Sequence, residues 1–234
     1  FVPGLKVGKS GLENSQEKLL IGKYGIKRYE VNASGKRISQ IDYLKEEQGG
    51  NIRTTIDVEV QKLAQNLLKD KAGSICAMDI FKGDIIVMVS SNTFDANKIV
   101  HGISSQDWEN LIKNKKKPLI NKSMSGLYPP GSTIKPIVAL SSLENDVIST
   151  KLVVQCKGSI ELYGQTYHCW KEKGHGYMNL RDAIKQSCDV YFYEVARRLG
   201  VDRLSITAKK FGFGKRVLDS LSEEKIGLVP NTKW

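Results

Sequence analysis

The feature that most constrains the fold is a rigid turn that leads directly into an apolar helix. Residues 128–136 read Tyr-Pro-Pro-Gly-Ser-Thr-Ile-Lys-Pro, and an apolar run follows at 137–140. Two prolines and a glycine produce a stiff, non-helical approach. Pro136 is tolerated only in the first turn of a helix, where its missing N–H would have no intrahelical partner. The sequence therefore predicts a buried helix that begins close to Ser132 and runs to about Leu143.

In such a helix Ser132 and Lys135 lie at i and i+3 on one face. A serine hydroxyl becomes a nucleophile when a neighbouring base takes its proton, and a neutral lysine can do so. Backbone N–H groups at the same helix terminus can stabilise an oxyanion. The alternative is an N-cap serine followed by a solvated lysine. The pattern alone leaves both open, because Ser-x-x-Lys also occurs at 15–18 and 222–225.

The composition is that of a globular chain. At 234 residues, 40% apolar and 26% charged, it can hold one large domain, or one domain and a piece of another. It contains no run of about 20 apolar residues. Residues 1–4 do not form a signal peptide, and there is no initiator methionine. We therefore expect a piece of a longer protein from which an anchor or signal has been removed.

The net charge of +11 raises the question of nucleic-acid binding. The charge is scattered, and its densest run, Lys-Asn-Lys-Lys-Lys at 113–117, has no interleaved aromatic residues of the kind a single-strand binder needs. An anionic membrane surface nearby explains the charge equally well. We predict no nucleic-acid partner.

The N-terminal residues 1–50 are polar and interrupted by glycines. Two short strands are predicted at 28–32 and 36–41, around a turn at 32–35. The stretch has few large apolar residues and is interpreted as the remnant of a neighbouring domain. The linker at 46–50 then separates residues 1–50 from a second domain that covers 51–234.

The second domain is predicted to open with a helix, capped by Asp57 and ended by Gly73, that carries an apolar stripe. Apolar strands at 74–80 and 84–90 follow, joined by the turn Phe81-Lys82-Gly83, and form a central antiparallel hairpin. Cys76 is predicted to lie in the core of that hairpin. The stripe consists of Val60, Leu63, Ala64, Leu67 and Leu68.

The remaining chain alternates between polar segments and helices. Residues 91–125 are predicted as a polar excursion with one short helix at 106–113, and residues 146–178 as a turn-rich segment. Three helices are predicted after it: 180–185 capped by Asn179, about 188–199 stopped by Gly200, and a last one capped by Asp202 and ended by Gly212.

A second group of polar residues lies at the junction of two of these helices, where Ser187, Cys188 and Asp189 follow one another. A hydroxyl and a carboxylate two residues apart can orient a lysine and relay a proton. The alternative is a helix cap followed by a buried cysteine.

Taken together, three segments resemble one family, the penicillin-binding transpeptidases, and most closely its monofunctional, elongation-type members. The resemblance covers nearly the whole chain. The segments are 128–136, then Cys169-Trp170 with His175-Gly176, then Ser-Cys-Asp-Val-Tyr-Phe-Tyr at 187–193; residues 8–13, 54–57 and 94–97 fit the same pattern.

The resemblance implies an α/β fold of the α+β type, with an antiparallel central sheet and helices on both sides. The sheet is expected to be incomplete, and residues 1–50 to be the remnant of a pedestal, or dimerisation, domain. The family's third motif, Lys-Ser/Thr-Gly on a strand, is missing; Lys9-Ser10-Gly11 has its letters but lies in the wrong domain. We therefore expect a chain truncated after Trp234 that is catalytically weak or inactive, with an open sheet edge that favours self-association.

The same resemblance assigns roles to four residues. Ser132 would be acylated by a stem-peptide D-Ala-D-Ala or by penicillin, with Lys135 as its general base. Ser187 and Asp189 would occupy the second motif and shuttle protons to the leaving group. The implied function is that of a peptidoglycan D,D-transpeptidase of cell elongation and shape, with no cofactor for catalysis.

The resemblance also implies a location and partners. The intact protein would be periplasmic, anchored to the inner membrane by an N-terminal segment absent from this chain. It would act on peptidoglycan stem peptides, bind β-lactam antibiotics and work with a membrane glycosyltransferase of the elongation machinery. The alternatives are a serine β-lactamase or β-lactam sensor and, from a different class, a non-catalytic scaffold of cell-wall synthesis.

Three of the four cysteines lie near a histidine: Cys156, Cys169, His175 and Cys188 are separated by 13, 6 and 13 residues. Each of these side chains suits zinc, and Cys₃His is a common closed structural site. Some elongation-type relatives are understood to carry zinc in this region, so we predict a structural zinc here. A Cys156–Cys169 disulfide with Cys188 buried and free, or three unlinked thiols, are the alternatives, since the implied periplasmic location permits disulfides.

Overall fold

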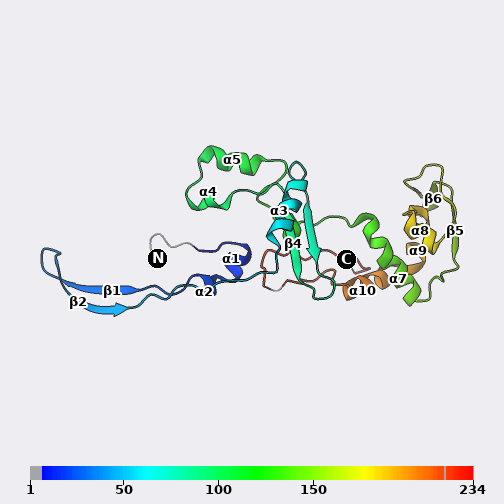
Figure 1. Ribbon diagram of the computed structural model, residues 1–234. Helices are drawn as coiled ribbons and strands as arrows, with labels where there is room; N and C mark the ends of the chain where they lie inside the picture. The colour runs from blue at the N-terminus through cyan, green and yellow to red at the C-terminus, as the bar shows by residue number, and fades with distance from the viewer. Residues whose placement is uncertain (1–6, 219, 234) are drawn as a thin grey trace. The chain divides into compact units, whose positions relative to one another are not determined.

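The structure is a computed structural model that describes residues 7–218 and 220–233, in two compact units that are treated separately (Figure 1). The N-terminal unit comprises residues 7–126, 218 and 220–225. The catalytic-motif unit, so called because it holds residues 128–136 and 187–193, comprises residues 127–217 and 226–233. In the part of the chain that is described, none of the helices combines the length and the apolar character needed to cross a membrane.

The N-terminal unit contains short helices and two separate antiparallel hairpins. Its elements are α1 (Gly11–Ser15), α2 (Glu17–Leu20), β1 (Ile26–Val31), β2 (Arg37–Leu44), α3 (Val58–Leu67), β3 (Ser74–Met78), β4 (Ile85–Ser90), α4 (Ala96–Val100), α5 (Ser105–Lys113) and α6 (Lys122–Ser125).

The first hairpin, β1–β2, confirms the predicted strand pair and is longer than predicted (Figure 1). Its turn is held by Asn32, whose side-chain oxygen accepts the backbone N–H groups of Ser34 and Lys36 at 3.1 and 2.8 Å. Gly35 has φ of +75°, a conformation that favours glycine. Apart from Tyr29, which is half-buried, every residue of the two strands is exposed.

Helix α3 starts as predicted, because the Asp57 carboxylate accepts the N–H groups of Glu59 and Val60 at 3.0 Å. The helix ends at Leu67, before the predicted stop at Gly73. The predicted apolar stripe is largely uncovered, because Val60, Leu63 and Leu67 are exposed. Only Ala64 and, in part, Leu68 pack against the sheet, because the two-stranded hairpin is too narrow to cover the whole apolar face of the helix.

The hairpin β3–β4 is antiparallel as predicted, with Gly83 in its turn at φ of +76°. The buried position predicted for Cys76 is wrong: its side chain is exposed. Successive strand residues point to opposite faces, and Ile75 occupies the face that packs against Val87 and Val89. Cys76 therefore lies on the opposite face, which is exposed.

The two outer edges of this hairpin differ. The outer edge of β4 is closed by the chain before it: Asp57 N–H donates to the Ile86 carbonyl at 2.9 Å, and the Gln61 side-chain amide bonds both N–H and C=O of Met88 at 2.9 Å. Among the described residues, β3 pairs with no strand other than β4. Of the two outer edges, as far as the described residues show, that of β3 is the one open to a further strand.

The polar excursion contains more helix than predicted. Helix α5 confirms the predicted short helix and is capped by the Ser104 hydroxyl, which accepts from Asp107 N at 3.1 Å. Helices α4 and α6 were not predicted. They have only 5 and 4 residues, too few for a helical repeat of apolar positions to be recognised.

The catalytic-motif unit contains the helices that form the largest hydrophobic core of the described residues. That core is built mainly on α9, with Val190, Tyr191, Phe192, Val195 and Leu199 buried. The unit's elements are η1 (Gly131–Ile134, a 3₁₀ turn), α7 (Lys135–Glu144), β5 (Val153–Cys156), β6 (Ser159–Leu162), β7 (Gln165–His168), β8 (Gly176–Asn179), α8 (Leu180–Lys185), α9 (Asp189–Leu199) and α10 (Val201–Lys210).

The segment predicted as turn-rich contains two antiparallel strand pairs, β5–β8 and β6–β7. Each strand has only 4 residues, which is too short for alternation to stand out in the sequence. Helix α8 has the predicted cap, with the Asn179 side chain accepting from Asp182 N at 2.9 Å. The predicted cap of α10 is wrong: Gly200 occupies that position, and the Asp202 carboxylate instead accepts the N–H and hydroxyl of Thr232.

Candidate active site and metal centre

The predicted nucleophile, Ser132, lies on the 3₁₀ turn η1 directly before α7. The predicted helix start is thus a tighter turn, which the Thr133 hydroxyl reinforces by donating to the Pro130 carbonyl. Residues i and i+3 of a 3₁₀ turn lie one above the other. The backbone N–H of Lys135 donates to the Ser132 carbonyl, which sets the two residues one turn apart. Ser132 is exposed, whereas Lys135 is 9% exposed.

The Lys135 side chain joins the two predicted motifs. Its Nζ donates to the Ser187 carbonyl at 2.8 Å, to the Ser187 hydroxyl oxygen at 2.9 Å and to Asp189 Oδ1 at 2.6 Å. These contacts join one nitrogen atom to three oxygen acceptors. The structure therefore brings together Lys135, Ser187 and Asp189, with Ser132 one 3₁₀ turn before the lysine.

The turn that carries Ser187 has an unusual backbone. Helix α8 ends at Lys185, and Ser187 adopts φ of +51°, in the left-handed region that non-glycine residues rarely occupy. Cys188 N–H then donates to the Ala183 carbonyl at 2.9 Å, and α9 begins at Asp189. The turn aims both the carbonyl and the hydroxyl of Ser187 at the lysine.

Asp189 holds its charge through two different partners. Oδ1 contacts the lysine, and Oδ2 accepts the backbone N–H of Trp170 at 3.0 Å. Burial raises the pKa of the Asp189 carboxyl, but the hydrogen bonds from Lys135 and Trp170 and the lysine charge outweigh it and lower the pKa. Its position in the first turn of α9 also favours a negative charge. Asp189 is thus an ionised partner for the lysine.

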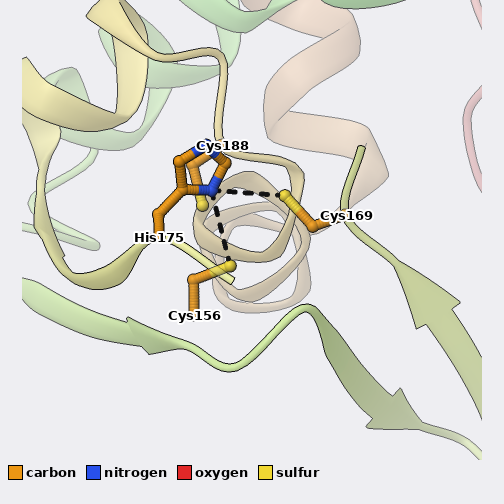
Figure 2. Close-up of side chains that lie close together, drawn as sticks. All are labelled: Cys156, Cys169, His175 and Cys188. Atoms are coloured by element: carbon orange, nitrogen blue, oxygen red, sulfur yellow. Dashed lines mark hydrogen bonds between the residues drawn. The ribbon is translucent and has the colours of Figure 1, made fainter. Parts of the chain in front are cut away.

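The four predicted metal ligands converge in the same unit. Cys156 ends β5, Cys169 follows β7, His175 precedes β8 and Cys188 occupies the N-cap position of α9. Their ligand atoms all lie within 4.8 Å of one another, and the three thiols are buried. Figure 2 shows the side chains pointing toward a common centre, with His175 Nδ1 3.6 Å from Cys156 Sγ and 3.5 Å from Cys169 Sγ.

These distances fit a tetrahedral zinc site. Ligands bound at roughly 2.3 Å for sulfur and 2.05 Å for nitrogen, at a tetrahedral angle, are about 3.6 Å apart. Burial, followed by the Lys171 charge, lowers the pKa of His175, which favours the neutral imidazole that binds metals. Neither Cys156 nor Cys169 forms a disulfide bond in the structure.

The thiols differ in acidity. Burial raises the pKa of Cys169, but the N–H groups of Lys171, Asp189 and Val190 reverse this and lower it. Burial raises the pKa of Cys188 to about 12. Cys169 therefore gives up its proton to a binding cation more readily than Cys188 does.

Sequence reasoning missed the contacts of Trp170. The residue was noticed only as part of a resembling motif, yet it bonds Asp189 through its backbone and two carbonyls of the Ser187 turn through its indole. Nothing in the spacing indicates these contacts, because Trp170 and Ser187 are 17 residues apart on different elements.

Two family profiles match the chain. The profile described as penicillin binding protein transpeptidase domain matches residues 73–234. The profile described as penicillin-binding protein dimerisation domain matches residues 1–54.

Individual relatives agree with these matches. The Escherichia coli peptidoglycan D,D-transpeptidase MrdA is 36% identical over 97% of this chain, which spans 36% of that protein. The solved complex of PBP2 and MreC from Helicobacter pylori superposes with a TM-score of 0.86 at 36% identity, over 97% of this chain and 43% of the other. The solved structure of a peptidoglycan synthase complex that coordinates polymerization and crosslinking superposes with a TM-score of 0.85 at 29% identity. The match covers 100% of this chain and 44% of the other. The chain thus spans about a third of the curated relative's length.

Proposed function

The chain belongs to the penicillin-binding protein transpeptidase family, and we propose that it is the part of a peptidoglycan D,D-transpeptidase that carries the nucleophile. One observation carries the assignment of residues: Lys135, one 3₁₀ turn after Ser132, is bound by both Ser187 and Asp189. An ordinary helix cap has no need of this arrangement.

In the proposed reaction the Ser132 hydroxyl oxygen attacks the carbonyl carbon of the penultimate D-Ala, and Lys135 takes the hydroxyl proton. The lysine passes that proton toward Ser187, whose Oγ is 2.9 Å away. The amide bond breaks when the departing D-Ala amine receives the proton, which leaves an acyl-enzyme at Ser132. An amine of a second stem peptide then attacks the ester and releases Ser132 as a hydroxyl.

Asp189 has a supporting role in this scheme. Its carboxylate stays ionised beside the lysine and stabilises the positive charge that appears when the lysine accepts a proton. The same geometry suits penicillin, because its lactam carbonyl would take the place of the D-Ala carbonyl and leave a comparable acyl-enzyme.

The nucleophile is tested by mass spectrometry after incubation with penicillin. The protein should continue past residue 234 to the length of its relatives. We expect one covalent adduct that maps to Ser132 and disappears in Ser132→Ala. Ser222→Ala is the matched control, because Ser222 also stands in a Ser-x-x-Lys pattern, and it should acylate like the wild type.

Two other results would change the assignment. Rapid loss of the adduct by hydrolysis would favour a β-lactamase or β-lactam sensor. A folded protein with no adduct would favour a non-catalytic scaffold of the cell-wall machinery.

We also propose that Cys156, Cys169, His175 and Cys188 hold a structural zinc ion. The ion would fix the backbone of Cys188, which lies between Ser187 and Asp189, and so support the second motif. It supplies no step of the acyl transfer. Elemental analysis should find one zinc per chain, lost in Cys188→Ser; absence of metal together with two fewer free thiols would establish the Cys156–Cys169 disulfide instead.

The biological setting is proposed from the relatives. A PBP2 is found in complex with MreC, and a similar chain occurs in a complex that coordinates polymerization and crosslinking. We expect this protein to act at the periplasmic face of the inner membrane with a polymerising glycosyltransferase, in elongation and cell shape. Co-purification of the full-length protein with such a partner, retained in Ser132→Ala, tests this independently of catalysis.

A further inference from the structure

We propose that Trp170 is a positioning residue for acyl transfer: its indole N–H holds the Ser187 turn, and through it the acceptors that bind Lys135. The inference rests on the proposed function. It concerns a side chain that touches none of the atoms that react.

The indole is placed by two hydrogen bonds to the end of α8. Trp170 Nε1 donates to the Gln186 carbonyl at 3.1 Å and to the Ser187 carbonyl at 3.2 Å. The last carbonyls of a helix have no intrahelical partner, and the indole provides a donor for that of Gln186, the C-cap residue of α8. The backbone N–H of the same residue donates to Asp189 Oδ2. Trp170 thus forms hydrogen bonds with the residues on both sides of Cys188: Gln186 and Ser187 before it, and Asp189 after it.

The Ser187 carbonyl links the indole to the lysine. Its oxygen accepts from Trp170 Nε1 at 3.2 Å and from Lys135 Nζ at 2.8 Å. Two donors that meet on one oxygen fix the orientation of that peptide group. Because Ser187 Oγ and Asp189 Oδ1 belong to the same turn, the orientation also decides where the other two acceptors of the lysine lie.

The turn needs such support because Ser187 is in the left-handed region, with φ of +51°. A non-glycine residue stays in that conformation only when its surroundings hold it there. Helix α9 holds the following residue, since Cys188 is fully buried. The carbonyl side of the turn is held by the indole and the lysine, and the lysine is the group that must move protons.

The exposure of Trp170 points in the same direction. The side chain is 64% exposed, so its burial alone does not explain its place. Its ring lies edge-on to His175 at 5.2 Å, which orients the indole toward the turn. Hydrogen bonding, rather than core packing, is therefore the main role of this side chain.

The first test uses hydrogen exchange of the indole N–H groups, read by NMR on the wild-type chain. We expect the Trp170 indole proton to exchange at least about 10-fold more slowly than that of Trp108, which is 41% exposed. Trp170→Phe identifies the resonance. Equal exchange rates for the two indoles would overturn the proposal, whether or not the protein reacts with penicillin.

The second test measures acylation in the protein extended to the length of its relatives, using a fluorescent penicillin. Trp170→Phe keeps an aromatic ring and the backbone N–H and removes only the indole donor. We expect the acylation rate constant to fall about 10-fold while the non-covalent dissociation constant changes less than 2-fold, with zinc content and melting temperature unchanged. Trp108→Phe should match the wild type.

The outcomes separate the two proposals. A Trp170→Phe protein that acylates at the wild-type rate overturns the positioning role and leaves Ser132 as the nucleophile. A rate loss accompanied by an equal loss of binding, zinc or melting temperature also overturns it, because it assigns Trp170 a purely structural role. A wild type that forms no adduct overturns the proposed function. In that case the exchange experiment still tests whether the Trp170 indole is hydrogen-bonded to the Ser187 turn.

Discussion

The two units of the chain differ in how completely they bury their apolar residues. In the catalytic-motif unit the helix α9 has Tyr191 and Val195 at 0% exposure within an extended core. In the N-terminal unit the hydrophobic cluster of the β3–β4 hairpin has only Ala64, Val87 and Val89 buried. Apolar residues beside it, such as Leu63 and Met78, are 58% and 59% exposed.

The difference shows which part of the fold holds the larger buried core, namely the catalytic-motif unit. A two-stranded sheet cannot cover a helix, and an isolated hairpin is only marginally stable in water. We therefore expect the catalytic-motif unit to carry most of the stability of this chain and the hairpin to be the weaker part.

The largest difference in stability between the two units should appear when a cysteine of each is replaced. Cys156→Ser removes a buried ligand of the proposed zinc site, and we expect loss of the metal with destabilisation of the catalytic-motif unit by more than about 3 kcal/mol. Cys76→Ser changes an exposed strand residue and should alter the free energy of unfolding by less than about 0.5 kcal/mol. Metal analysis and denaturant unfolding measure both. Equal effects would show that the four ligands hold no stabilising ion.

A matched pair of leucines probes the cores themselves. Leu199 is 3% exposed and Leu63 is 58% exposed. Leu199→Ala should cost about 3 kcal/mol, because it leaves a cavity in a closed core. Leu63→Ala should cost less than about 0.5 kcal/mol. Urea unfolding gives both values; a comparable loss from Leu63→Ala would mean that its helix face is covered in solution.

Glutamates give a smaller, pH-dependent contrast. Glu194, with a side chain 13% exposed, accepts from Arg197 and Arg198 at 2.9 and 2.7 Å. The hydrogen bond from Arg197 lowers the pKa of Glu194 from 4.5, and the hydrogen bond from Arg198 adds to this effect. Burial acts in the opposite direction but is outweighed. Because the folded pKa is the lower one, this stabilisation is present above pH 4.5 and is lost as the pH falls through the folded value.

We therefore expect Glu194→Gln to cost about 1 kcal/mol at pH 7 and to equal the wild type once the pH lies below the folded pKa. The control is Glu47→Gln, which removes an exposed pair with Lys23 and should cost nothing measurable at any pH. Unfolding midpoints from pH 7 to pH 2.5 measure the difference, and a pH-independent loss in Glu194→Gln would contradict the linkage.

The smallest effect on stability is expected at the open strand edge. Met78→Lys adds a charge to an exposed strand, which should change unfolding by less than about 0.5 kcal/mol but reduce self-association through β3. Ile206→Lys is the control, because Ile206 is similarly exposed, at 62%, on a helix. Light scattering should show a lower mass for Met78→Lys only; a monomeric wild type would contradict the association.

Local signals in the sequence predicted elements well where each was long or strongly marked. Asp57, Ser104 and Asn179 cap helices in the structure, and the caps at 57 and 179 were predicted. Several short elements were missed, because each is shorter than a detectable repeat. They are the 3₁₀ start of the Ser132 helix, the helices α4 and α6, and the four-residue strands β5, β6, β7 and β8. Asp202 was misplaced as a cap because its real partner, Thr232, is distant in sequence.

The sequence by itself determined the candidate residues. They are a hydroxyl and an amine three residues apart, the Ser-x-Asp triplet at 187–189, and three cysteines with a histidine. These are local patterns that depend on residue type and spacing. Only the tertiary structure decided that Lys135 reaches Ser187 and Asp189, that the four ligand atoms meet within 4.8 Å, and that Cys76 and Leu63 are exposed. Contacts across dozens of residues depend on how α7, α9 and the short strands pack, and the backbone of Ser187 and the indole of Trp170 acquire their roles only there.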